Sequence, residues 1–210
     1  GLTDAVRRRA GLADLPASSV AAGGGADGPP CSLTFVYKVA AEVGRLGDNV
    51  AELRRQIASD DLLRMAMSQP GTHIAVLGHT RWASSGVISV PNCHPVDNST
   101  YSGGGSADGP GSHRCGRIFV VMNGDVDNHL ELRSEYEAET GRCVSPRVTT
   151  DTKVVALEIE RRLAAGRPVE DAFREACARF TGSCAIGMLT DLEPGRLFLS
   201  LRGSGQSLYV

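Results

Sequence analysis

The order of apolar patterns along the chain is the feature that most constrains its fold. An early stretch, Leu33–Val39, is rich in β-branched and aromatic residues and is typical of a strand. Two patterns with helical spacing follow one another between residues 150 and 180. Strand-like runs then close the chain, at Cys184–Leu189 and Leu197–Leu201. Because strands and helices do not alternate regularly, this order predicts a layered α+β fold rather than a βαβ repeat.

The remaining expected elements are placed by the same periodicities and by capping residues. The first is a helix capped by Asp48 or Asn49, with Val50, Leu53 and Ile57 on one face. Short buried strands are expected at Ile74–Leu77 and Ile118–Met122. Two more helices follow: one is capped by Thr149 or Thr150, has Val155, Ile159 and Leu163 on one face and is stopped by Gly166, and the other covers about Val169–Phe180. Residues 17–30 and 102–113 are rich in Gly, Ser, Ala and Pro. Such segments gain little from burial, so we expect surface loops within a single domain that spans residues 1–210.

Composition excludes several classes of protein. With 210 residues, 41% of them apolar, the chain has room for one domain with a buried core. The net charge of −2 and the lack of a basic block argue against a nucleic-acid or anionic-membrane partner. No apolar run approaches the roughly 18 residues of a membrane span. The six cysteines are scattered, which favours reduced thiols and a cytoplasmic location.

Four polar clusters stand at or near the ends of apolar stretches, where a rigid scaffold can bring functional side chains to one rim. They are His79–Gly86, Asn92–Pro95, Asn123–Asn128 and Thr149–Thr152. In order and spacing, GHTRWASSG, NCHP, NGDVDNHLELR and TTDTKV resemble the glutaminase domain of glutamine–fructose-6-phosphate aminotransferases, a class II amidotransferase family. The resemblance covers roughly residues 46–210.

The resemblance implies a fold, a reaction and partners. The fold is the four-layered αββα sandwich of the N-terminal-nucleophile hydrolases. A thiolate attacks the side-chain amide of L-glutamine, and the ammonia released passes to a sugar-phosphate isomerase domain that makes glucosamine 6-phosphate from fructose 6-phosphate. That domain would follow this chain, and the parent enzyme would be a homo-oligomer. No metal or cofactor is implied.

By the same resemblance, the loop Gly78–Gly86 would bind glutamine. Arg81 would hold the α-carboxylate, since a planar guanidinium can make two charge-assisted hydrogen bonds to it. Ser84 stands where the family has Thr and would assist, and Trp82 would help to close the loop, although core packing is an equally good interpretation of this residue. Ser85 stands where the family usually has His, which puts the affinity for glutamine in question.

The other motifs would complete the site. Asn123 and Gly124 match an oxyanion hole, which needs preorganised donors where negative charge develops; a plain Asn-Gly hairpin turn is the alternative. Asp151 matches the carboxylate that pairs with the α-ammonium, helped by the carbonyl of Gly124; it could also complement a helix dipole. His94 matches a histidine near the site and is interpreted as structural.

The expected nucleophile is an N-terminal cysteine, and the chain opens with Gly1. We expect a short strand with that cysteine to precede Gly1, and this chain by itself not to hydrolyse glutamine. A degenerate, glutamine-binding regulatory domain is the alternative. A zinc-stabilised domain using Cys93, His94, His113 and Cys115 is a weaker one, because the spacing is not that of a known zinc finger.

Overall fold

The structure is a computed structural model. The chain divides into two compact units, Gly1–Ala75 and Val76–Val210. The described residues are 18–23, 32–40, 47–81, 85–102 and 116–210. No helix within these ranges is long and apolar enough to cross a membrane.

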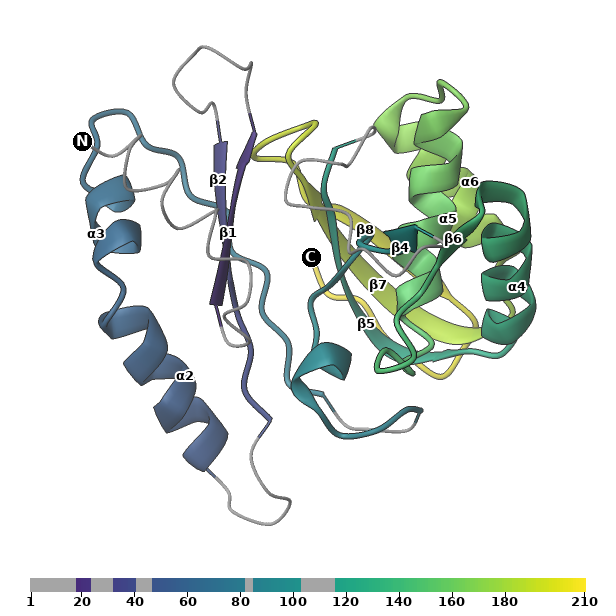
Figure 1. Ribbon diagram of the computed structural model, residues 1–210, viewed down its shortest axis with the longest axis horizontal. Coiled ribbons are helices and arrows are strands. Elements are labelled where there is room, and N and C mark those ends of the chain that lie inside the picture. Colours follow the sequence, from purple (N-terminus) through teal and green to yellow (C-terminus); the bar gives the residue numbers. More distant parts are fainter. Residues whose placement is uncertain (1–17, 24–31, 41–46, 82–84, 103–115) are drawn as a thin grey trace. The chain divides into compact units, whose positions relative to one another are not determined.

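The first unit contains a pair of strands and two helices (Figure 1), namely β1 (Ser18–Gly23), β2 (Ser32–Tyr37), α2 (Asp48–Ala58) and α3 (Asp61–Met67). The two strands are antiparallel, with Ser18 opposite Tyr37. The strand expected at Leu33–Val39 is therefore confirmed. The loop expected at residues 17–30 is wrong in part, because its first half pairs with β2 as β1; residues 24–30 lie outside the described residues.

A buried aspartate ties the elements of this unit together. Asp60 precedes α3 and accepts hydrogen bonds from the backbone N–H of Leu62 at 3.0 Å and of Leu63 at 3.1 Å. It also accepts from the Tyr37 hydroxyl at 2.6 Å. This one carboxylate therefore caps a helix and holds it to β2.

The start of α2 differs from the expectation. Gly47 with φ of +97° takes the cap position, and no side chain caps the helix, so Asp48 and Asn49 lie inside its first turn. Glycine tolerates this φ at no steric cost, which explains why the helix starts one residue early. On the apolar face of this helix, Val50 is 47% and Ile57 39% exposed, and Leu53 is half-buried.

The second unit is built on a four-stranded sheet in the order β3-β5-β7-β8, with all neighbours antiparallel (Figure 1). Its strands are β3 (Val96–Asp97), β5 (Ile118–Val126), β7 (Gly182–Thr190) and β8 (Phe198–Arg202). The strands expected at Ile118–Met122, Cys184–Leu189 and Leu197–Leu201 are thus confirmed, and β5 extends four residues beyond its expected end. Asn123 and Gly124 therefore lie within a strand, opposite Ala185 and Cys184 of β7, and form no hairpin turn.

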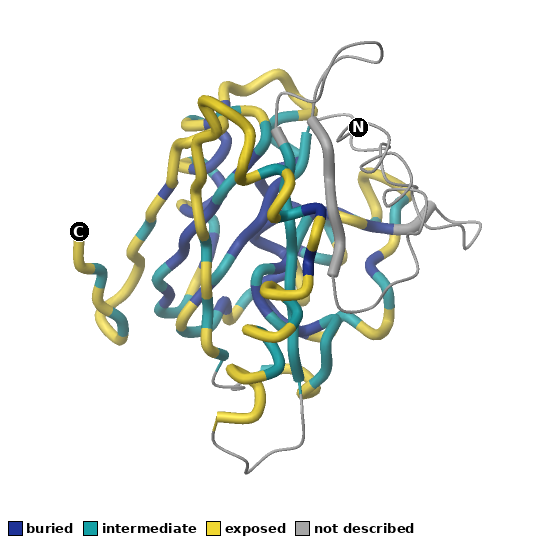
Figure 2. Tube along the Cα trace, turned by 90° about the vertical axis from the view of Figure 1, so that its left-hand side faces the viewer, coloured by how far each residue is buried: buried dark blue, intermediate teal, exposed yellow. Residues whose placement is uncertain are grey.

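Two helices, α5 (Lys153–Ala164) and α6 (Val169–Arg179), pack on one face of this sheet, and α4 (His129–Thr140) packs beside α5 (Figure 1). Between them and the sheet lies the main core, to which α5 contributes Val155 and Ile159 and α6 contributes Phe173. Among the residues whose burial is described, most of the buried ones belong to this unit (Figure 2). The expected helices are confirmed, but the cap of α5 is Thr152 without a side-chain bond, so the expected cap by Thr149 or Thr150 is wrong.

Short elements complete the second unit. They are a 3₁₀ turn, η1 (Val90–Asn92), and the paired strands β4 (Tyr101–Ser102) and β6 (Arg142–Cys143). Residues 103–113, the rest of the second expected loop, lie outside the described residues. The mixture of helices with an antiparallel sheet agrees with the α+β class, and the four-layered arrangement stays a prediction.

One residue of the predicted site, Asn123, lies on the other face of the sheet. Along β5, Ile118, Val120 and Met122 are buried, whereas Asn123 is exposed and Val121 is half-buried. Alternation in a strand sends successive side chains to opposite faces, so Asn123 projects from the face away from the helices.

The strand expected at Ile74–Leu77 is wrong. No strand forms there, and Ile74 is 58% and Val76 84% exposed. Leu77 alone is half-buried, and its side chain lies close to Gly187, at the centre of β7. The apolar run was expected to pair as a strand, but none of the described strands pairs with it.

Candidate active site

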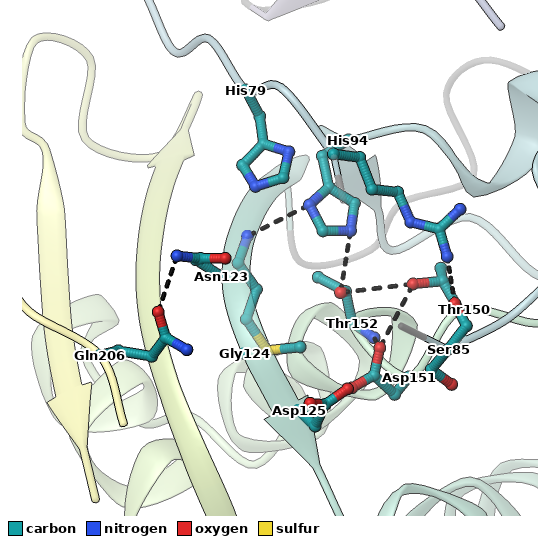
Figure 3. Close-up of a pocket in the computed structure, with 12 residues that line it drawn as sticks. His79, Ser85, His94, Asn123, Gly124, Asp125, Thr150, Asp151, Thr152 and Gln206 are labelled. Carbon is teal, nitrogen blue, oxygen red and sulfur yellow. Dashed lines mark hydrogen bonds between the residues drawn. The ribbon is translucent and has the colours of Figure 1, made fainter. Parts of the chain in front are cut away.

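A small pocket opens beside the C-terminal part of β5 (Figure 3). Its volume is about 210 Å³, below the roughly 300–1,000 Å³ of pockets for drug-sized ligands. It therefore suits a small polar molecule. The lining comes from five separate segments of the second unit and consists of His79, Arg81, Ser85, His94, Met122, Asn123, Gly124, Asp125, Thr150, Asp151, Thr152 and Gln206.

Gly124 lets β5 approach β7 closely in the wall of the pocket. Its φ is +101°, and a Cβ at this position would lie 2.0 Å from the carbonyl oxygen of Ser183. Only glycine fits such a position. The neighbouring Asn123 side chain donates a hydrogen bond to Oε1 of Gln206 at 2.7 Å (Figure 3). An amide donor on the exposed face thus stands beside a glycine backbone, as an oxyanion hole requires.

Asp151 supplies a buried carboxylate just before α5. It is 4% exposed, and it accepts hydrogen bonds from the backbone N–H of Val126 and of Thr152, both at 2.9 Å. Burial raises the pKa of Asp151, as does the nearby Asp125, while the two backbone hydrogen bonds oppose the rise. A cationic ligand beside Asp151 would offset this cost of burial and favour the charged form.

Asn92, in the NCHP motif, holds the segment that carries Asp151. It is fully buried, and its Oδ1 accepts hydrogen bonds from the backbone N–H of Thr149 at 2.7 Å and of Thr150 at 3.0 Å. Its Nδ2 donates to Ser89 Oγ at 2.9 Å and to the carbonyl oxygen of Arg147 at 3.0 Å. Three of these hydrogen bonds therefore place this segment against η1, and the fourth, to Ser89, lies within the turn itself.

Two histidines lie side by side at the rim of the pocket, with ring centroids 4.4 Å apart. His94 is buried and held at both ring nitrogens, by the backbone N–H of Met122 at 3.3 Å and by Thr152 Oγ1 at 2.9 Å. Burial lowers the pKa of His79, and the neighbouring Arg81 also lowers it, against a backbone hydrogen bond with Met122. Nδ1 of His79 is buried without a hydrogen-bond partner within the described part of the chain.

Arg81 enters the pocket from a loop that is docked on the Asp151 segment. Its guanidinium donates to the carbonyl oxygen of Ser85 and, at 3.3 Å, to that of Val87. Val87 N–H in turn donates to Thr149 Oγ1 at 2.9 Å, and Gly86 lies so close to Thr149 that a Cβ would meet it at 2.9 Å. The loop and the Thr149 segment therefore form one wall.

Of the residues predicted for the site, Arg81, Ser85, Asn123, Gly124 and Asp151 line this pocket together, and so does His94. Trp82 and Ser84 lie outside the described residues. The pocket therefore joins a guanidinium, a buried carboxylate and a side-chain amide. Such a set is complementary to a small zwitterion that carries an amide.

The described residues contain no group of three or more His, Cys, Asp or Glu side chains that could hold a metal. His113 and Cys115, of the zinc alternative, are not among them. None of the pocket-lining residues is a cysteine. Cys184 lies opposite Gly124, but it is fully buried and burial raises its pKa, which disfavours a reactive thiolate.

Sequence reasoning missed several residues of the site. His79, Thr150 and Thr152 stand inside the motifs that were recognised, so their position in those motifs was the available signal. Asn92 also belongs to a motif, but its contacts are to residues more than 50 positions away. Gln206 comes from the far end of the chain, and no pattern connects it with Asn123.

Comparison with known proteins gives sequence relatives. No protein-family model matches the chain. It is 33% identical over 168 residues, 80% of its length, to the glutamine–fructose-6-phosphate aminotransferase (isomerizing) of Caulobacter vibrioides, of which it covers 24%. It is 35% identical over 128 residues, 61% of its length, to the protein of the same name from Pyrococcus horikoshii, of which it covers 18%. The chain thus spans less than a quarter of the length of these curated relatives.

A solved structure is also similar: the glutamine phosphoribosylpyrophosphate amidotransferase of B. subtilis, complexed with ADP and GMP. The TM-score is 0.41 and the identity 19%, over 59% of this chain and 22% of that chain. The similarity to the aminotransferases rests on sequence, at about one identical residue in three over most of the chain.

Proposed function

We propose that residues 76–210 form the glutamine-binding part of a class II glutamine amidotransferase domain, of the kind found in glutamine–fructose-6-phosphate aminotransferases. The observation that carries the proposal is the convergence of Arg81, Asn123 and Asp151 on one small pocket, although up to 70 residues separate them in the sequence. In this assignment Arg81 binds the α-carboxylate of glutamine, Asp151 binds its α-ammonium, and Asn123 with Gly124 receives its side-chain carbonyl.

The physical chemistry of each group supports its assigned role. Arg81 already uses two N–H groups on loop carbonyls, which fixes the guanidinium in the pocket with further donors to spare. Asp151 is a buried carboxylate with a raised pKa, so an ammonium ligand would offset part of its desolvation. Asn123 presents N–H donors from the exposed face of a rigid strand.

The proposal has a wider form. The domain would adopt the four-layered αββα sandwich and would release ammonia from glutamine through an N-terminal cysteine. A sugar-phosphate isomerase domain would use that ammonia to make glucosamine 6-phosphate. This form rests on the similarity to the aminotransferases.

A glutamine-binding regulatory domain is the second candidate. One observation favours it: Ser85 replaces the histidine of the family within the loop. The two candidates share the binding site, and release of glutamate from glutamine distinguishes them.

Binding can be tested by calorimetry on the chain with L-glutamine and two truncated analogues. One analogue, 4-aminobutanamide, lacks the α-carboxylate, and the other, glutaramate, lacks the α-ammonium. Arg81→Ala should weaken glutamine about 10- to 100-fold, as expected for a hydrogen bond to a charged group, and should leave 4-aminobutanamide unchanged. Asp151→Asn should weaken glutamine and spare glutaramate.

Arg54→Ala serves as the matched control, because Arg54 is an exposed arginine on α2, in the first unit. It should leave the binding of all three ligands unchanged. If Arg81→Ala weakens the binding of glutamine and of 4-aminobutanamide equally, Arg81 does not bind the α-carboxylate of glutamine. If the unmodified chain binds none of the three ligands, the proposed function is wrong.

A further inference from the structure

The side chain of Gln206 accepts a hydrogen bond from Asn123, the amide donor of the proposed site. Asn123 Nδ2 donates to Gln206 Oε1 at 2.7 Å, and Gln206 itself lines the pocket (Figure 3). The group on Gln206 is a primary carboxamide on a two-carbon stem, the same group that a glutamine substrate would present. The pocket thus holds a glutamine side chain of its own at the place assigned to the substrate's amide.

The backbone holds Gln206 in this place. The segment after β8 passes over Ser183, at the start of β7, where Gly205 N–H donates to Ser183 Oγ at 2.8 Å. Gly203 has φ of +75°, and a Cβ there would lie 2.9 Å from Ser183. The carbonyl oxygen of Ser183 also lies against Gly124 of β5. Ser183 therefore supports both the strand that carries Asn123 and the segment that carries Gln206.

We propose that Gln206 is a resident ligand of the amide subsite: its carbonyl takes the hydrogen bond of Asn123 until the side-chain amide of glutamine displaces it. This inference rests on the proposed function. Displacement exchanges one amide–amide hydrogen bond for another, so Gln206 lowers the affinity for glutamine by competition at Asn123. A ligand without a side-chain amide does not compete for that bond. Gln206 is therefore a specificity-determining residue.

The test compares L-glutamine with L-norvaline, which has the same α-groups and no side-chain amide. Calorimetry on the chain should show that Gln206→Ala binds glutamine about 2- to 10-fold more tightly, the range for one neutral hydrogen bond, with norvaline unchanged. Gln206→Asn should behave like Gln206→Ala, because its stem is one carbon too short to reach Asn123. Gln206→Glu should weaken glutamine, since a charged acceptor binds the Asn123 donor more strongly.

Ser207→Ala is the matched control, because Ser207 is the exposed neighbour of Gln206 and does not line the pocket. Ser207→Ala should change the binding of neither glutamine nor norvaline. If Gln206→Ala leaves glutamine binding unchanged or weaker, the inference is wrong while the proposed function stands. Equal tightening of glutamine and norvaline also overturns it, because the variant would then have loosened the segment as a whole. Absence of glutamine binding by the unmodified chain is a failure of the proposed function itself.

Discussion

Asn92 is the residue whose removal should reveal most about how the site is held. It lies fully buried at the end of η1 and makes four hydrogen bonds, two of them to the backbone N–H groups of Thr149 and Thr150. Asp151 follows directly. Replacing Asn92 by alanine removes all four hydrogen bonds and leaves a small cavity between two segments of the pocket wall.

The loss of stability in Asn92→Ala depends on which of the former hydrogen-bond partners of Asn92 water can reach. Thr149 and Arg147 are exposed, so their backbone groups can turn to solvent, and each lost bond costs about 0.5–1.5 kcal/mol. Thr150 is 4% exposed, so its N–H stays buried without a partner at about 1–3 kcal/mol. Asn92→Ala should therefore lower the free energy of unfolding by about 2–6 kcal/mol, a large share of the roughly 5–15 kcal/mol of a typical domain.

Urea unfolding measures the total loss of stability, and amide hydrogen exchange at Thr150 measures how far the loss opens this segment locally. Asn92→Asp is the matched control, because its carboxylate keeps the acceptor for Thr149 and Thr150 and loses only the donor side. Exchange at Thr150 should speed up strongly in the alanine variant and much less in the aspartate variant. Equal exchange in the two variants, or no change in either, would refute the role assigned to Asn92.

Three further predictions follow from single contacts. Gly124→Ala should destabilise the chain in urea by about 2–4 kcal/mol, because its Cβ would lie 2.0 Å from a carbonyl oxygen at positive φ; Gly141→Ala, also at positive φ but with open space, should cost only about 1–2 kcal/mol. The pKa of His79, followed by NMR, should lie below its ordinary value of about 6.5 because of burial; its contribution to stability is then fully present above that pH and is lost as the pH falls through the lowered pKa. A measured value at or above 6.5 would contradict this. Tyr136→Phe should cost about 1.5–3 kcal/mol, since it removes a buried 2.6 Å hydrogen bond to a carboxylate, whereas Tyr209→Phe, at a side chain 92% exposed, should leave the urea midpoint unchanged.

The sequence supports reliable inference where apolar periodicity and burial agree. Val155 and Ile159 repeat at helical spacing and are both fully buried in α5, so pattern and structure coincide. At Ile74–Leu77 the pattern was just as apolar, yet no described strand pairs with it. An apolar run indicates that a segment can be buried, but pairing depends on which backbone lies beside it, and that is a tertiary property.

The residues of the candidate site also differ in how far the sequence predicts them. Several residues that line the pocket could be named because they belong to short motifs, and motif residues such as Arg81 and Asp151 carry recognisable charges. Their supports could not be named, because Asn92 and Gln206 act through partners 57 to 83 positions away. Nothing local distinguishes a buried, bridging amide from an exposed one.

Register is what connects these distant parts. Asn123 faces the pocket only because it stands at an exposed position of β5, and a slip of one residue against β7 would turn it toward the helices. Gly124 opposes such a slip. The carbonyl oxygen of Ser183 leaves no room for a Cβ at this position, so a slip that placed any neighbour of Gly124 there would create a clash. The glycine next to the amide donor therefore fixes the strand register on which the orientation of that donor depends.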